Sequence, residues 1–245
     1  MRRAYDLTSL LEELPSGKEY RPLKESIKRF AGAFSIREDL KEVAKTLDTL
    51  TILDQSNVSQ DRERFGLALM TLTVTTYCRA FAVNGSRRSI DGTKGMSREL
   101  LAKHQRVIQL RHKVMAHYDD GSDDALVQAF LSERAVLKVV EAGAALSIVL
   151  IRANYLAQLV QDIYLLLEHV GPIVQAACGE RMSELMERLL VLNRTDPHFN
   201  KLMERCPFDP ADFYRGAYSE ERFWANEDSS SEKRDPLGQL FPLEP

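Results

Sequence analysis

A helical repeat of apolar residues is the feature of this sequence that most constrains its fold. Between Ile36 and about Asp54, apolar side chains recur at steps of three and four positions: Leu40, Val43, Ala44, Leu47, Leu50 and Leu53. This spacing gathers them on one side of an α-helix, and that side must be buried against other elements. The sequence therefore predicts a helix that packs into a core.

Two more long helices are predicted after this one. The first starts near Ser59 and stops at Asn84-Gly85, and its residues 65–77 are apolar nearly all round, which predicts a central position. The second starts at Ser97, a residue type that caps helix starts, and ends at Asp119-Asp120-Gly121-Ser122. Both are expected to belong to one bundle with the first helix.

The pattern is mixed from residue 134 to residue 151. Its β-branched residues predict a small β-hairpin, and a helix remains the alternative. Helical periodicity returns from Tyr155 to Val170 and from Ile173 to Leu192, and Gly171-Pro172 is expected to separate two helices. The predicted fold class is thus mainly α, an antiparallel helical bundle with a small hairpin insert.

The two ends of the chain are predicted to be extensions of the bundle. Residues 1–35 hold two short amphipathic helices, about Tyr5 to Leu14 and Leu23 to Phe34, separated by Pro and Gly residues. Residues 193–245 are expected to form an irregular acidic tail. The bundle itself is expected over residues 36–192.

Composition excludes several classes of protein. With 44% hydrophobic and 28% charged residues, the chain has the make-up of a globular domain rather than a disordered one. No window of about 18 residues is uncharged and apolar, and the first residues lack the apolar run of a signal peptide. The three cysteines, Cys78, Cys178 and Cys206, suit neither a disulfide framework nor a Cys-x-x-Cys metal site. We expect no membrane partner, no metal, no cofactor and a cytoplasmic location.

Positive charge is concentrated in one segment. The net charge is -3, but the residues from Arg79 to Lys113 include nine basic and two acidic ones, a local charge of +7. A segregated basic zone on an acidic protein suggests an anionic ligand such as RNA or phosphate, and a solvated helix surface is the alternative. The candidate phosphate contacts are Arg79, Arg87, Arg88, His104 and Lys113.

A cluster of histidines and cations lies at the end of this segment, in the sequence Arg111-His112-Lys113-Val114-Met115-Ala116-His117. A neutral imidazole, whose ordinary pKa is about 6.5, can take a proton from a ribose 2′-hydroxyl, and a guanidinium can hold the scissile phosphate in a bidentate fork. Zinc binding is disfavoured because His112 and His117 lie about 140° apart on an ideal helix. These residue types suit RNA strand cleavage without a metal ion.

This cluster, followed by Tyr118-Asp119, resembles the Arg-(x four to six)-His signature of the HEPN superfamily, and most closely that of abortive-infection HEPN-like proteins. The resemblance covers about Ile36 to Val170. Two further stretches are similar to such proteins: Tyr77-Cys78-Arg79-Ala80-Phe81 and Gly85-Ser86-Arg87-Arg88. The resemblance implies a compact helical bundle with the motif on a late helix, a homodimer, and a metal-independent endoribonuclease of the toxin or antiviral-defence type.

The resemblance also implies a role for each motif residue. Arg111 would bind the phosphate, His112 would be the polar residue that shapes the site, and His117 would be the acid/base residue. The implied partners are RNA and an antitoxin or other protein. Family members silenced by nucleotidylation carry Tyr two residues after the His, where this chain has Asp119, so that regulation is not expected.

The spacing of Arg111 and His117 bears on the assembly of the site. The two residues point about 120° apart on an ideal α-helix, so either the helix unwinds near His117 or a second chain completes the site. A twofold dimer with its interface near the motif helix would supply the second set of residues. Two alternatives remain: His117 is a core histidine, and the chain is a non-catalytic helical scaffold that dimerises and binds a partner through its basic face.

Overall fold

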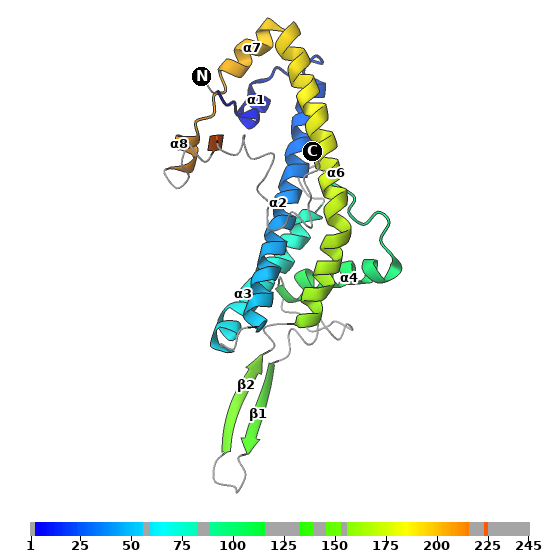
Figure 1. The fold of residues 1–245 in the computed structure, drawn as a ribbon, viewed down its shortest axis with the longest axis vertical. Coiled ribbons are helices and arrows are strands. Elements are labelled where there is room, and N and C mark those ends of the chain that lie inside the picture. Colours follow the sequence, from blue (N-terminus) through cyan, green and yellow to red (C-terminus); the bar gives the residue numbers. More distant parts are fainter. Residues whose placement is uncertain are drawn as a thin grey trace. The chain divides into compact units, whose positions relative to one another are not determined.

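Helices make up most of the computed structural model, which describes residues 3–55, 59–82, 89–115, 133–139, 146–152, 156–215 and 223–224 (Figure 1). The mainly helical class predicted from the sequence is confirmed. The chain divides into two compact units, one comprising Met1–Phe34, Val83–Ser89 and Gln175–Pro245, the other Ser35–Ala82 and Ile90–Val174. Among the helices of the described residues, none combines the length and the hydropathy needed to cross a membrane.

Helix α2 (Arg21–Gln55) is continuous, where the sequence predicted two helices, Leu23 to Phe34 and Ile36 to Asp54. The prediction of a break was wrong because only Ser35 stands between the two stretches, and it is not a helix breaker. Ala33 and Ile36 are both buried, so one apolar stripe continues across this position. The residues of the helical repeat from Leu40 to Leu50 are at most 1% exposed.

Helix α3 (Ser59–Ala80) is central on one side only. Its residues Met70, Val74 and Tyr77 are fully buried, whereas Phe65 and Leu72 are 44% and 42% exposed. Among the described residues, part of the apolar surface of α3 is therefore left uncovered by the rest of the chain.

Helix α4 (Arg98–Gln109) begins where the sequence predicted it. The hydroxyl of Ser97, the N-cap residue, accepts a hydrogen bond from the backbone nitrogen of Leu100 at 3.1 Å. The next element, η1 (Leu110–Met115), continues the chain as a π-helix. The motif helix thus departs from α-helical geometry at the residue before Arg111.

Helix α6 (Ala157–Thr195) passes through Pro172 without a break, so the interruption predicted at Gly171-Pro172 is wrong. Proline removes the bond that its N–H would donate to the carbonyl of Glu168. Both Glu168 and Pro172 are exposed, so water can serve that carbonyl. Val170 and Val174, on either side, are fully buried, and their packing holds the helix together.

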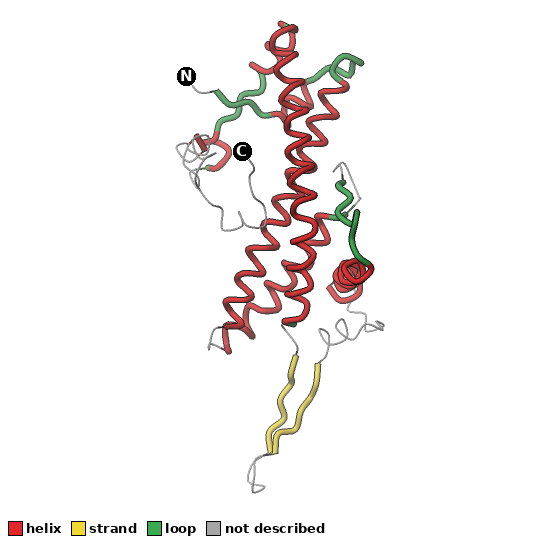
Figure 2. Tube along the Cα trace, turned by 45° about the vertical axis from the view of Figure 1, so that its right-hand side comes forward, coloured by secondary structure: helices red, strands yellow, loops and turns green. Residues whose placement is uncertain are grey.

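Strands β1 (Glu133–Val139) and β2 (Leu146–Arg152) form a two-stranded antiparallel sheet (Figure 2). Val136 lies opposite Val149 at the middle of the register. The hairpin predicted over residues 134–151 is confirmed, and the helical alternative is wrong. The residues between the strands lie outside the part of the chain that the structure describes.

The unit that holds both chain ends has its own core, with residues from α1 (Leu7–Glu13), the start of α2, the end of α6 and α7 (Pro197–Glu204). Its buried members are Leu10, Leu14, Tyr20, Leu23, Ile27, Leu185, Phe199, Leu202 and Cys206.

The tail predicted to be irregular after residue 193 starts with two helices, α7 and α8 (Pro210–Tyr214). Asp196 and Asp209 accept hydrogen bonds from backbone nitrogens at the two helix starts, and a proline follows each at the first helical position. The sequence analysis had assigned both helix starts to the irregular tail. An acidic N-cap followed by proline is instead a helix-start pattern.

Candidate nucleic-acid interface

Arg111 and His112 lie side by side at the start of the π-helix η1, and both side chains are exposed. Val107 and Leu110, just before them, are buried and anchor this end of the helix. A π-helix forms i→i+5 hydrogen bonds, and such segments occur often at functional sites. Because the chain is π-helical from Leu110, the angle of 120° between Arg111 and His117 that an ideal α-helix gives does not apply here.

A hydrogen bond joins the two exposed residues. The distance between Arg111 Nη1 and His112 Nδ1 is 3.2 Å. A guanidinium has only donors, so Nδ1 of His112 must accept. This contact corresponds to the tautomer that carries its proton on Nε2. This leaves Nε2–H as a second hydrogen-bond donor beside the guanidinium.

Helix α3 contacts the helix that carries the motif through Cys78. The Cys78 Sγ donates to the backbone oxygen of Val107 at 3.7 Å. Burial raises the pKa of Cys78 to about 12, and the nearby Arg111 cation opposes part of that rise. A buried thiol with a raised pKa is inert as a nucleophile. Cys78 thus belongs to the packing under the motif.

His104, one of the predicted phosphate contacts, is buried. Its Nδ1 is 2.9 Å from the hydroxyl oxygen of Tyr77, and the ring of Phe81 meets it edge-on at 5.1 Å between centroids. Burial lowers the pKa of His104 and raises that of Tyr77. A neutral imidazole bonded inside the protein is a packing residue rather than a phosphate ligand.

Two cations of the basic segment pair with one buried carboxylate. Asp162 on α6 is fully buried, and its oxygens lie 2.6 Å from Lys103 Nζ and 2.9 Å from Arg106 Nη1. Gln158 donates a further hydrogen bond to it at 3.1 Å. Lys103 and Arg106 are therefore committed to joining α4 to α6.

Arg79, one of the predicted phosphate contacts, is also paired. Its Nη2 lies 2.6 Å from Oδ1 of the buried Asp39, although the arginine side chain itself is 63% exposed. The hydrogen bond to Asp39 raises the pKa of Arg79. Part of the positive charge of Arg79 is thus compensated by Asp39 within the protein.

The remaining candidates divide between exposed residues and undescribed ones. Lys94, Arg98, Arg111 and His112 are exposed. Arg87, Arg88 and His117 lie outside the described residues, and Lys113 lies in η1 with its side chain outside the description. The structure therefore brings together Arg111 and His112 but does not describe how His117 stands toward them.

The sequence reading missed Tyr77, Asp39 and Asp162 as partners of this region. One signal was available for Asp162, because it is a charged residue inside the buried run of Leu159, Val160 and Ile163. A charge in such a place must be paired. Asp39 offers a similar signal beside Leu40. No pattern within the basic segment itself points to either aspartate.

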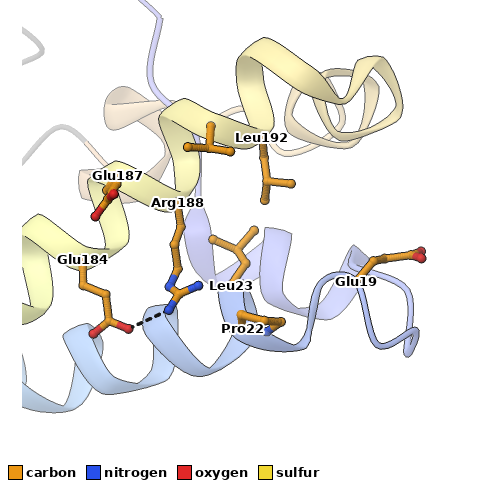
Figure 3. Close-up of a pocket in the computed structure, with 8 residues that line it drawn as sticks. Glu19, Pro22, Leu23, Glu184, Glu187, Arg188 and Leu192 are labelled. Carbon is orange, nitrogen blue, oxygen red and sulfur yellow. Dashed lines mark hydrogen bonds and ion pairs between the residues drawn. The ribbon is translucent and has the colours of Figure 1, made fainter.

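A cavity of about 340 Å³ in the unit of the chain ends is a poor alternative site for RNA (Figure 3). Its lining includes Glu19, Glu184 and Glu187 but a single cation, Arg188. Glu184 accepts a hydrogen bond from Arg188 at 3.1 Å and forms an ion pair with Arg29 at 2.7 Å. An acidic lining repels phosphate, and the most enclosed carboxylate already links α2 to α6.

The described residues contain no group of three or more His, Cys, Asp or Glu side chains that could hold a metal ion. Comparisons with protein-family models, with curated proteins and with solved structures found no match to this chain.

Proposed function

We propose that this chain binds RNA and cleaves it without a metal ion, with Arg111 as the phosphate-binding residue. The observation that carries the proposal is the exposed pair of Arg111 and His112 at the first residues of a π-helix. Within the described residues Arg111 pairs with no carboxylate, and apart from the Nη1 group that donates to His112 its N–H groups are open to a phosphate in this proposal.

The chemistry assigns a separate task to each motif residue. The guanidinium of Arg111 holds the phosphate in a bidentate fork, and Nε2–H of His112 adds a donor next to it. His117 takes the proton from the 2′-hydroxyl, which attacks the adjacent phosphorus and expels the 5′-oxygen of the next nucleotide. The expelled 5′-oxygen takes a proton from water, and the products are a 2′,3′-cyclic phosphate and a 5′-hydroxyl. Exposed Lys94 and Arg98, with Arg87 and Arg88, contact the RNA backbone.

Two copies of the chain make up the proposed ribonuclease. A single chain supplies one Arg111 and one His117, whereas a twofold pair supplies two of each. Paired chains also double the positive potential that attracts RNA. The RNA and an antitoxin or other regulatory protein are the partners that this proposal names.

Cleavage of an end-labelled RNA in EDTA tests the proposal. The wild-type protein should cleave, and Arg111→Ala should slow cleavage by about 10²-fold or more, because a charge clamp on the phosphate is lost. Arg111→Lys keeps the charge but not the fork, so it should restore little. The control is Arg21→Ala, an exposed arginine on α2, which should cleave like wild type.

Melting temperatures of the variants separate chemistry from folding. An Arg111→Ala protein that melts like wild type and still cleaves at the wild-type rate would refute the role of Arg111. Activity that disappears in EDTA and returns with zinc or magnesium would refute the metal-independent mechanism.

One observation favours a second function, that of a non-catalytic scaffold that binds a partner through its basic face. Lys103, Arg106 and Arg79 are engaged by buried aspartates, and His104 is bonded to Tyr77. The positive charge that this surface can present to RNA is therefore smaller than the local charge of +7. Failure of the wild-type protein to cleave RNA, combined with dimerisation, is the outcome that this second function predicts.

A further inference from the structure

The β-hairpin exposes apolar side chains that a stable protein normally covers. None of its side chains that the structure describes is buried. One face carries Ala135, Leu137 and Val139 from β1 and Ile148 and Leu150 from β2. Ile148 and Leu150 are 78% and 69% exposed, and Leu137 and Val139 are 56% and 63% exposed. A two-stranded hairpin with an uncovered apolar face is marginal in water.

The two strands differ in how their outer edges are protected. Each pairs on one side only within the described part of the chain, so the other edge presents free N–H and C=O groups. Strand β1 carries the exposed cations Arg134 and Lys138. Strand β2 has no charged residue, proline or glycine from Leu146 to Ile151. Charges block the pairing of an edge, so β1 is protected and β2 is not.

We propose that strand β2 pairs antiparallel with strand β2 of a second copy of this chain, which makes a four-stranded sheet across a twofold axis. The partner is a second copy because β2 meets itself without placing like charges opposite each other, whereas β1 would set its own cations against one another. Antiparallel pairing of identical strands is isologous, so two copies close the assembly.

The register follows from the length of the strand. The full seven residues of β2 pair only if the axis passes through Val149, its central residue. Ile148 then lies opposite Leu150 of the other copy, and the two most exposed apolar residues of the hairpin cover each other. Side chains directly opposite in an antiparallel pair have Cβ atoms about 5 Å apart.

The same arrangement explains the cations on β1. In the four-stranded sheet the two β1 strands become the outer edges, where Arg134 and Lys138 oppose the addition of further strands. The pairing therefore stops at two copies. The sequence analysis predicted a dimer interface near the motif helix, whereas this proposal assigns an interface to β2. The pairing supplies the dimer of the proposed ribonuclease, but it does not depend on RNA cleavage.

Light scattering on two matched variants tests the pairing. The wild-type protein should have twice the chain mass of 27.9 kDa. Val149→Lys puts two like charges on the axis and should give a monomer. Val136→Lys is the control, because Val136 lies directly opposite Val149 on the same face but on the protected strand, and both are half-buried. It should remain a dimer. Mixing Val149→Lys with Val149→Asp should restore the dimer.

Disulfide cross-linking tests the register. Val149→Cys should form a covalent dimer under oxidation, and Val136→Cys should not. The native cysteines Cys78, Cys178 and Cys206 are buried and do not interfere. A wild-type monomer, a dimer that survives Val149→Lys, or loss of the dimer in both lysine variants overturns the proposal. Because these readouts are mass and cross-linking, they stand or fall separately from RNA cleavage.

Discussion

His104 and Tyr77 form a buried hydrogen bond whose two partners come from different helices, α4 and α3. Burial lowers the pKa of the imidazole, because removing it from water disfavours its charged form. The sequence analysis named His104 as a candidate phosphate contact because it lies in the basic segment. Its actual partner lies 27 positions away, beyond the reach of any local pattern.

The stability of the protein should depend on pH through His104. In the unfolded chain its pKa has the ordinary value of 6.5, so below that pH the unfolded state binds a proton that the folded state does not. The free energy of unfolding should therefore fall as the pH drops below about 6.5 and level off beneath the lowered folded-state pKa. Urea unfolding between about pH 5 and pH 8 measures this profile.

Two asparagine variants make the pH measurement specific. His104→Asn keeps a group that can bond the Tyr77 hydroxyl but does not titrate, so it should flatten this part of the profile. His198→Asn replaces an exposed histidine on α7 and is the control for losing a histidine as such. An unchanged slope in His104→Asn would remove His104 as the cause.

The charge of the basic segment could be counted from the sequence. Which of its cations are already paired with carboxylates could not. Asp162 lies 59 positions from Lys103 and 56 from Arg106, and Asp39 lies 40 from Arg79. A local sum of charges counts the cations and misses these distant carboxylates. Arg111 is exposed, as Lys94 and Arg98 are, and its hydrogen bond to the exposed His112 distinguishes it from those two cations.

At the scale of elements, helix starts were easier to predict than helix breaks. Ser97 caps α4 as its residue type predicts, because the capping bond is local. The continuity of α6 through Pro172 depends instead on the burial of Val170 and Val174 against other elements, which the sequence does not display. The hairpin was predictable because β-branched residues fill both strands. Its register required the structure.

Replacing Pro172 with alanine should stabilise the protein. The new N–H can bond the carbonyl of Glu168 in the helix interior, where proline is about 3 kcal/mol less favourable than alanine. We expect the free energy of unfolding to rise by about 1 to 3 kcal/mol in urea titrations. Pro197→Ala, at the first position of α7, should change it by less than about 0.5 kcal/mol, because proline is tolerated there. A Pro172→Ala protein no more stable than wild type would contradict this account of α6.

At the scale of the whole molecule, the sequence predicted a mainly helical protein with a small hairpin, and both features are present. The resemblance to HEPN proteins rests on the motif and on the two stretches 77–81 and 85–88, since no compared protein supports it. The association of two chains stays a prediction. The surfaces that two chains would share cannot be identified from the apolar pattern of any one helix. The exposed apolar residues of the hairpin became visible only once both strands had been placed.

Cleavage of one RNA oligonucleotide in EDTA, beside a DNA of the same sequence, is the measurement that tests the central claim most directly. The 2′-hydroxyl is the proposed nucleophile, so the protein should cut the RNA, leave 2′,3′-cyclic phosphate ends and spare the DNA. Intact RNA, equal cutting of the DNA, or RNA products with 3′-hydroxyl ends would contradict the account.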